Sequence, residues 1–203
     1  MKIICIGHNY AGHNTEMKTA SPAEPVFFMK PDTALLIKNK PFYYPDFSTD
    51  IQYEVELVVK ISKSGKHIDP DFAGNYYQEI GIGIDFTARD IQAQCKARGG
   101  PWEKAKSFDC SAPVGKFILK NEFPDLHNIN FQLNLNGKSV QAGNSKNMLF
   151  SFDKIIVYIS RFITLRPGDL VFTGTPEGVG PVKPGDHLEA QIEGQSLLNM
   201  KVK

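Results

Sequence analysis

The chain has 203 residues, of which 41% are hydrophobic, so it is long enough for one buried core and short for two. Lys and Arg number 23 against 22 Asp and Glu, and the resulting net charge of +1 provides no bulk field to attract nucleic acid or an anionic membrane. No signal peptide or membrane span is apparent, and three widely spaced cysteines are typical of a reducing compartment. We therefore expect one domain over residues 1–203 in a cytoplasmic protein.

The first half of the chain predicts short strands followed by a helix. Apolar or alternating runs predict strands at residues 2–6, 26–29, 53–61 and 79–86. A helix is predicted to begin at Thr87, because Thr87 and Asp90 resemble a capping pair, and to end before Gly99.

The second half predicts a hairpin, a helix and a series of strands. Residues 131–141 form the hairpin, with an Asn136-Gly137 turn. The helix covers residues 152–161, and the last forty residues read as strands separated by Pro-Gly-Asp turns at 167–169 and 184–186. The whole pattern indicates a β-rich α+β fold with a few short helices.

Two glutamates lie two residues apart in a predicted strand. Because side chains alternate along a strand, Glu54 and Glu56 project from one face. Adjacent carboxylates repel one another unless a cation or a proton relieves them, and oxygen ligands favour a hard cation such as Mg²⁺ or Mn²⁺. Asp85, at the end of an apolar run, would add a third carboxylate. The alternatives are a solvated strand face for the glutamates and a helix cap for Asp85.

His13 and Glu16 are three residues apart, so they share a face if this segment forms a helical turn. A carboxylate that holds a histidine makes a general base able to activate water. The alternative is a mobile polar loop on the surface.

Four further polar residues stand in settings that suggest ligand binding. Lys30 and Lys106 lie in apolar segments, where lysine is seldom found without an anion to meet. Arg89 and Gln92 open the predicted helix, where an anion would also contact the helix N-terminus. The alternatives are lysines that reach solvent with their ammonium groups, and simple surface exposure of Arg89 and Gln92.

A glycine-rich segment over residues 173–180 follows a predicted strand. It would present backbone N–H groups and Thr175 to a carboxylate. It is not a phosphate-binding P-loop, because no Gly-Lys-Ser or Gly-Lys-Thr follows at the required spacing. The alternative is a purely structural connection.

Six short segments in a fixed order carry the most specific signal in the sequence. They are Gly7-His8-Asn9-Tyr10 with His13 and Glu16, Phe28–Pro31, Tyr53–Leu57, Asp85–Asp90, Ala105–Asp109, and Thr173–Pro176 followed by Gly178–Gly180. Together they resemble the fumarylacetoacetate hydrolase family along nearly the whole chain. The segment Trp102–Phe108 and the Gly-Val-Gly-Pro-Val loop are most similar to the short acylpyruvate hydrolase and oxaloacetate decarboxylase branch. His8 stands where relatives often carry Arg or Leu, which would change the mouth of the pocket.

The resemblance implies a complete catalytic site with Mg²⁺ or Mn²⁺ as cofactor. The implied residues are the metal ligands Glu54, Glu56 and Asp85, the catalytic groups His13, Glu16 and Lys106, and the contacts to substrate or its support Lys30, Arg89, Gln92 and Thr175. The dyad of His13 and Glu16 would lie on a lid segment. The implied fold is a mixed β-roll or β-sandwich with a few short helices, usually assembled as a homodimer, with no nucleic-acid or membrane partner.

The implied activity is hydrolytic C–C cleavage of acylpyruvates, a class of 2,4-dioxo acids, through a metal-chelated pyruvate enolate. Two alternatives would use the same site: decarboxylation of oxaloacetate, which gives the same enolate, and isomerisation of 2-hydroxyhepta-2,4-diene-1,7-dioate, which needs only proton movement. A non-catalytic metal-binding protein is an alternative of another class, and it predicts a missing carboxylate or dyad member. All of these residues are present in the sequence.

Overall fold

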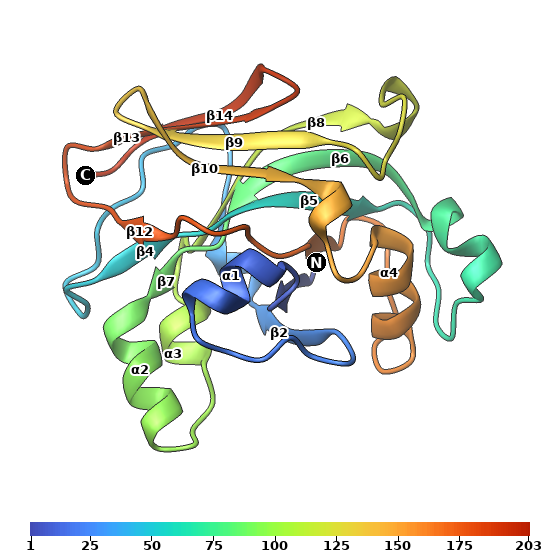
Figure 1. Ribbon diagram of the computed structural model, residues 1–203, viewed down its shortest axis with the longest axis horizontal. Coiled ribbons are helices and arrows are strands. Elements are labelled where there is room, and N and C mark those ends of the chain that lie inside the picture. The colour runs from blue at the N-terminus through green and yellow to red at the C-terminus, as the bar shows by residue number, and fades with distance from the viewer.

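The computed structural model describes all 203 residues, and strands dominate it (Figure 1). The largest sheet contains, in spatial order, β2 (Val26–Lys30), β1 (Ile3–Gly7), β11 (Leu170–Phe172), β5 (Val55–Ile61), β6 (Tyr77–Ile84), β8 (Ala112–Leu119) and β3 (Leu35–Leu36). The pairs β1–β11 and β3–β8 are parallel, while the other neighbours are antiparallel. The sheet is therefore mixed.

Two smaller antiparallel sheets close the fold. One contains β10 (Lys138–Asn144), β9 (Asn130–Leu135), β13 (His187–Ile192) and β14 (Gln195–Lys201), and the other contains β12 (Gly180–Pro181), β4 (Ile51–Tyr53) and β7 (Thr87–Ala88). In Figure 1 the four-stranded sheet arches over β5 and β6, so the strands curl around a core of 37 buried hydrophobic residues. The predicted β-rich roll with a few short helices is confirmed.

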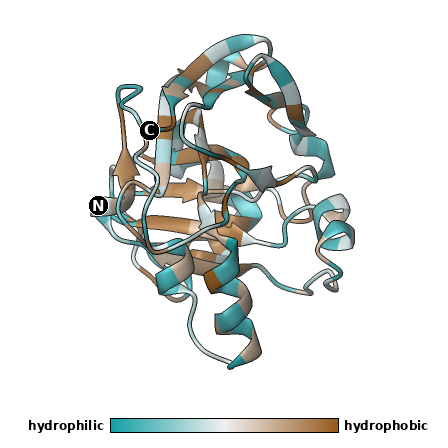
Figure 2. Ribbon diagram, turned by 90° about the vertical axis from the view of Figure 1, so that its left-hand side faces the viewer, coloured by the Kyte–Doolittle hydropathy of each residue, from teal (hydrophilic) through white to brown (hydrophobic).

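Four short α-helices lie outside the strands. They are α1 (Ala11–Glu16), α2 (Arg89–Ala97), α3 (Glu103–Lys106) and α4 (Phe152–Ser160), accompanied by 3₁₀ turns at Asp32–Ala34, Pro70–Tyr76, Lys120–Glu122 and Ser145–Asn147. Figure 1 shows α1 in front of the sheets and α2 beside α3. In Figure 2 the central strands are largely hydrophobic, while the helices at the lower edge are mostly hydrophilic. No helix is long and apolar enough to cross a membrane.

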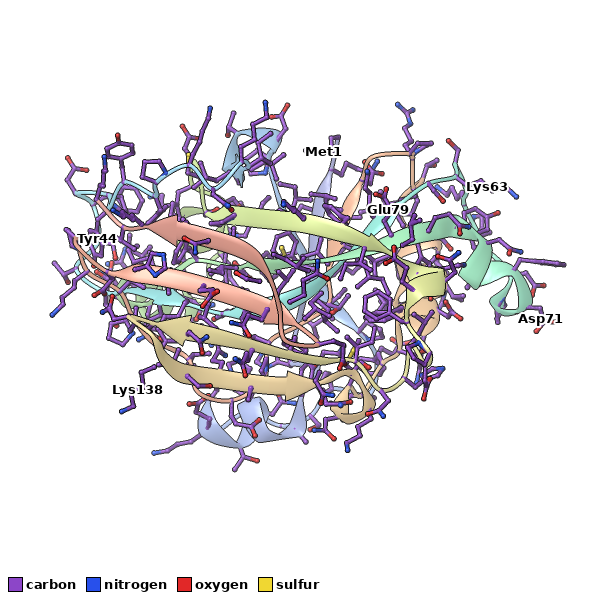
Figure 3. The ribbon with its side chains drawn as sticks, turned by 90° about the horizontal axis from the view of Figure 1, so that it is seen from above. Met1, Tyr44, Lys63, Asp71, Glu79 and Lys138 are labelled. Atoms are coloured by element: carbon purple, nitrogen blue, oxygen red, sulfur yellow. The ribbon has the colours of Figure 1, made fainter.

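Charged side chains mark the two ends of the molecule. Lys138, in the hairpin between β9 and β10, points outward at one end, and Lys63 and Asp71 do so at the other (Figure 3). The hairpin itself forms as predicted, because Asn136 and Gly137 both take the positive φ that a tight type I′ turn requires.

Two predicted boundaries are wrong. The strand expected over residues 53–61 is interrupted at Glu54, because Tyr53 pairs with Gly180 in one sheet while Val55 pairs with Ile84 in another. The helix expected from Thr87 begins at Arg89, since Thr87 belongs to β7.

The predicted capping pair at the start of α2 is also absent. Asp90 does not cap the helix with Thr87; its carboxylate instead accepts hydrogen bonds from the Ser48 hydroxyl at 2.7 Å and from the Thr49 backbone N–H at 3.0 Å. Asp90 therefore anchors the loop before β4.

Candidate metal and catalytic site

Three buried carboxylates meet where β4 passes into β5 and β6 ends. The Asp85 N–H donates to the Glu54 carbonyl at 2.8 Å, and Glu56 is paired with Gly83, so the two chain segments hold the acids side by side. One oxygen from each of Glu54, Glu56 and Asp85 lies within 4.8 Å of the others, and each residue is at most 5% exposed. Burying three like charges together is unfavourable without a compensating cation.

Two cationic side chains neutralise part of the negative charge of the three carboxylates. Lys106 Nζ, at the end of α3, donates to Glu54 Oε2 and Asp85 Oδ2, both at 2.8 Å, and Arg89 Nη2 donates to Glu54 Oε1 at 2.5 Å. Burial acts to raise the pKa of Glu54, but the charges of Lys106 and Arg89 prevail and hold this pKa well below its usual range. Burial conversely acts to lower the pKa of Lys106, and the charges of Asp85 and Glu54 raise it above normal, so the ammonium keeps its proton.

Glu56 is in a different electrostatic environment. Burial, followed by the charges of Asp85 and Glu54, raises the pKa of Glu56 well above its usual value, and its hydrogen bond comes from the Gly174 backbone N–H at 2.7 Å. Asp85 Oδ1 is also buried, and its one polar partner is the Lys30 ammonium at 2.8 Å. These under-used oxygens, in a cluster of three carboxylates, fit a hard divalent cation such as Mg²⁺ or Mn²⁺, which Glu54, Glu56 and Asp85 would hold.

Lys30 contacts the carboxylate cluster but does not line the pocket. Its ammonium donates to the Ser111 hydroxyl at 2.9 Å and to the carbonyls of Phe86, Lys106 and Ser111, and it lies 2.8 Å from Asp85 Oδ1. The side chain is fully buried, and the pocket lining does not include it. Lys30 is expected from the sequence to contact substrate or its support, and at this position its contact is to Asp85, a supporting one.

The structure brings His13 and Glu16 together on α1, as expected for a dyad. His13 Nδ1 lies 3.4 Å from Glu16 Oε2, which is long for a hydrogen bond, and catalytic contacts of this kind commonly tighten when substrate binds. The Gly178 backbone N–H donates to both Glu16 carboxylate oxygens at 3.2 Å. Glu16 thus joins the predicted lid helix to the glycine-rich loop, while His13 is buried and faces the pocket.

The acids and the dyad histidine open into one small polar pocket. Its lining residues are Ile6, Gly7, His8, His13, Met17, Phe28, Glu54, Glu56, Asp85, Arg89, Gln92, Lys96, Trp102, Lys106 and Thr175. Eight of the ten residues predicted for the site are among them, and the two outside are Glu16 and Lys30. The free space measures about 30 Å³, roughly what one or two water molecules need.

Arg89 and Gln92 occupy the same wall of the pocket. Arg89 Nη1 donates to Gln92 Oε1 at 2.8 Å, and Arg89 Nε donates to Gln52 Oε1 at 2.8 Å. These bonds fix the guanidinium beside Glu54 and leave the Gln92 amide N–H groups available for a ligand.

Gln141, which the sequence did not indicate, holds the pocket residue Thr175 in place. Gln141 Nε2 donates to the Thr175 hydroxyl at 2.9 Å and to the Pro176 carbonyl at 3.0 Å, while its Oε1 accepts from the Val55 N–H at 2.9 Å. One buried amide therefore ties the glycine-rich loop to the start of β5. No local pattern signals this role, because Gln141 lies on a hairpin strand 34 residues before Thr175.

Comparison with known proteins places these features in a family. The model of the fumarylacetoacetate hydrolase C-terminal region matches residues 2–203, and the chain belongs to this family. The chain is 43% identical to the mitochondrial oxaloacetate tautomerase of Bos taurus over 201 residues, which cover 99% of this chain and 90% of that protein. It is 41% identical to an oxaloacetate tautomerase of Escherichia coli, covering 97% and 90%.

Solved structures give the same assignment. A fumarylpyruvate hydrolase from Pseudomonas aeruginosa, determined in complex with Mn²⁺ and pyruvate, superposes with a TM-score of 0.94 at 36% identity and covers 100% of this chain and 89% of that one. A fumarylacetoacetate hydrolase family protein from Yersinia pestis gives a TM-score of 0.95 at 41% identity, covering 100% and 93%. The resemblance inferred from the six segments is thereby confirmed, including the branch of oxaloacetate-active and acylpyruvate-active members.

Proposed function

We propose that this protein is a Mg²⁺- or Mn²⁺-dependent enzyme that interconverts the keto and enol forms of oxaloacetate or a closely similar 2-oxo acid. The buried cluster of Glu54, Glu56 and Asp85, with Lys106 between two of them, carries the proposal. When bound, the metal supplies positive charge that holds the 2-oxo carboxylate end and favours negative charge on the 2-oxo oxygen. The oxaloacetate tautomerases of Bos taurus and Escherichia coli, 43% and 41% identical to this chain, support oxaloacetate as the substrate.

The side chains of the pocket have complementary roles in this reaction. The C–H bond next to the 2-oxo group breaks and an O–H bond forms on the 2-oxo oxygen, so the reaction needs one proton acceptor and charge stabilisation. His13 faces the pocket and is positioned to take the proton from carbon and to return it to the 2-oxo oxygen. Lys106, which keeps its charge, stabilises the enolate oxygen, and preorganised charge of this kind is usually the largest catalytic contribution. The Thr175 hydroxyl, held by Gln141, orients the carboxylate.

A second candidate is hydrolytic cleavage of acylpyruvates, which the His13–Glu16 pair favours. In this reaction His13 takes a proton from water, and the water oxygen attacks the distal carbonyl. The C–C bond then breaks, its electron pair stays on the pyruvate fragment as an enolate, and a proton completes pyruvate. Decarboxylation of oxaloacetate reaches the same enolate by loss of CO₂ and needs no attacking water.

Three assays of purified, metal-loaded protein test these candidates. Decay of the enol absorbance measures oxaloacetate tautomerisation, coupled detection of pyruvate measures decarboxylation, and loss of the dioxo chromophore measures acylpyruvate hydrolysis. We expect tautomerisation to be accelerated with Mg²⁺ or Mn²⁺ and abolished by a chelator. Absence of metal-dependent acceleration in all three assays would contradict the proposal and favour a non-catalytic metal-binding protein.

We also propose that residues 1–203 act as one catalytic domain in a reducing compartment such as the cytoplasm. The family model extends over residues 2–203, which supports the first point. The second is supported by Cys5, Cys95 and Cys110, none of which forms a disulfide.

A further inference from the structure

Two basic side chains line the pocket without belonging to the carboxylate cluster or the dyad. They are Lys96, in the last turn of α2, and His8, directly after β1. Glu54 and Asp85 already pair with Arg89, Lys106 and Lys30, and no carboxylate, Glu56 included, lies within 4.0 Å of the Lys96 ammonium. The pocket therefore contains positive charge that its own acids do not neutralise.

The position of Lys96 follows from the geometry of α2. Arg89, Gln92 and Lys96 are spaced i, i+3 and i+7, so they share one helix face, and all three line the pocket. Arg89 contacts the metal-site acid Glu54, and Lys96 follows about two helical turns, or roughly 10 Å, further along the axis. Helical side chains lean toward the N-terminus, which aims Lys96 back toward the Arg89 end.

The surroundings of the Lys96 ammonium favour a bound anion. Its Nζ lies 5.5 Å from the centre of the Trp102 ring, another pocket residue, so the ammonium is at the pocket wall. Burial lowers the pKa of Lys96, and the charge of Arg89 lowers it further. A neighbouring anion would offset this mutual repulsion of cations.

The His8 imidazole is held with one nitrogen free. The Asn14 amide donates to the His8 carbonyl at 3.1 Å and to the Ser21 hydroxyl at 3.2 Å, which leaves Asn14 Oδ1 to accept from His8 Nδ1 at 3.2 Å. The Thr19 hydroxyl also lies 3.2 Å from Nδ1, and Nε2 has no partner in the protein. With Nδ1 donating to Asn14, Nε2 donates to a carboxylate only as the imidazolium; burial lowers the pKa of His8, and a bound anion would oppose that shift. His8 keeps this position despite a φ of 61°, which is unusual for a residue other than glycine.

From this juxtaposition we propose that Lys96 and His8 bind a second carboxylate of the substrate, so that the site selects dicarboxylic 2-oxo acids over 2-oxo acids with a neutral far end. One carboxylate and the 2-oxo group would occupy the acid cluster, and the other carboxylate would meet the Lys96 ammonium and His8 Nε2. The proposal rests on the proposed function, because it takes the metal cluster as the binding site for the 2-oxo end.

A pair of ligands isolates the second carboxylate. Oxaloacetate and 2-oxobutyrate share the 2-oxo carboxylate end and the chain length, and differ by a carboxylate against a methyl group. The experiment measures how each displaces oxalate from Mn²⁺-loaded protein, in the wild type and in two variants. Lys96→Met removes the charge and keeps the apolar stem, and His8→Asn removes the imidazole with a residue that tolerates positive φ. Lys104→Met, at an exposed lysine of α3 outside the pocket, is the matched control.

We expect Lys96→Met to weaken displacement by oxaloacetate roughly 10- to 100-fold, the effect of losing a hydrogen bond between charged groups, and His8→Asn to act in the same direction. Binding of 2-oxobutyrate and of oxalate should change by less than about twofold in both variants, as should all ligands in Lys104→Met. Equal weakening of both 2-oxo acids, or unchanged oxaloacetate affinity in both variants, would overturn the proposal.

Failure of the proposed function would look different. If the wild type bound these ligands but did not tautomerise oxaloacetate, the reaction would be wrong. The ratio of the displacement constants of oxaloacetate and 2-oxobutyrate would still test whether Lys96 and His8 bind the second carboxylate, because binding requires no turnover.

Discussion

Glu56 is the acid of the cluster that no side-chain cation neutralises, since Lys106 and Arg89 pair with Glu54 and Asp85. Glu56→Gln removes one proposed ligand charge with little change in shape. We expect Mn²⁺ affinity, measured by titration calorimetry, to fall by more than about 100-fold, beyond the 10- to 100-fold effect typical of residues that only support a ligand. Glu79→Gln, at a half-exposed acid of β6, should bind Mn²⁺ as the wild type does. Unchanged affinity in Glu56→Gln would remove this residue from the metal site.

Lys30 should matter for stability because its ammonium is enclosed by oxygen atoms. Lys30→Met leaves Asp85 without one of its cations and the Phe86 carbonyl without a donor. Removing one partner of a buried ion pair costs about 3–5 kcal/mol. Urea denaturation should show this loss, whereas Lys60→Met, which breaks a half-exposed pair with Glu79, should cost about 1 kcal/mol or less. Similar values for the two variants would contradict a buried supporting role.

His13 tests the proposed general base. His13→Ala should lower acylpyruvate hydrolysis by about 10²–10⁴, the usual contribution of a positioned base, while Mn²⁺ affinity stays unchanged because His13 is not a proposed metal ligand. Glu16→Ala should have a similar effect, and the double variant should be little worse than either, because the two residues act as a unit. Steady-state turnover by metal-loaded protein is the measurement. Near-normal hydrolysis by His13→Ala would leave His13 without a role in hydrolysis.

The residues of the site were more predictable than their contacts. Glu54 and Glu56 could be paired from strand alternation, and His13 and Glu16 from helical spacing, because both pairs are local. The burial of Lys30 could not be predicted, since it depends on a segment more than 50 residues away in sequence. The role of Gln141 depends likewise on a loop more than 30 residues away. Lys96 shares a helix face with Arg89 and Gln92, but a lone lysine near the end of a predicted helix does not by itself indicate a pocket residue.

At the scale of elements, the loop before β12 positions a ligand of the proposed metal site through one glycine. Gly174 has a φ of 99°, its N–H donates to Glu56, and an added Cβ would lie 2.6 Å from Asn9 Cβ. Asn9 cannot move aside easily, because its buried amide bonds the backbone of Phe150 and Thr173. Gly174 must therefore remain glycine for both conformational and steric reasons.

Gly174→Ala should consequently weaken Mn²⁺ binding about 10-fold or more, through the displaced N–H that supports Glu56. Gly168→Ala is the matched control: its φ is 86°, but an added Cβ meets nothing within 4 Å. The control should lose about 1–2 kcal/mol of stability from left-handed backbone strain, and Gly174→Ala should lose more. Calorimetry and urea denaturation measure the two effects. Equal Mn²⁺ affinity in both variants would show that the Gly174 N–H does not position Glu56.

Element boundaries near the site were the least predictable part of the fold. The hairpin at Asn136-Gly137 and the amphipathic α4 follow from local chemistry, and both form as predicted. The break at Glu54 does not, because it arises where one segment changes its pairing from β12 to β6. Tertiary pairing thus overrides the continuous alternation that the sequence presents.

At the scale of the whole molecule, the homodimer implied by the family resemblance stays a proposal. Ten large hydrophobic side chains remain at least 36% exposed, and association would remove part of this apolar surface from water. Sedimentation velocity should give a mass about twice the 22.6 kDa of one chain. A mass of one chain that persists at high micromolar concentration would contradict the dimer.

Metal binding should also stabilise the entire fold, because the proposed ligands join β5 to the end of β6 in the central sheet. A ligand that binds only the native state at 100 times its Kd adds about 2.7 kcal/mol to the free energy of unfolding. For a chain of this length that corresponds to a rise in Tm of roughly 5–11 °C. Calorimetric melting with Mn²⁺ should show the rise, a chelator should reverse it, and Glu56→Gln should show far less. An equal rise in the variant would place the bound metal away from Glu56, and no rise in either protein would argue against a metal site.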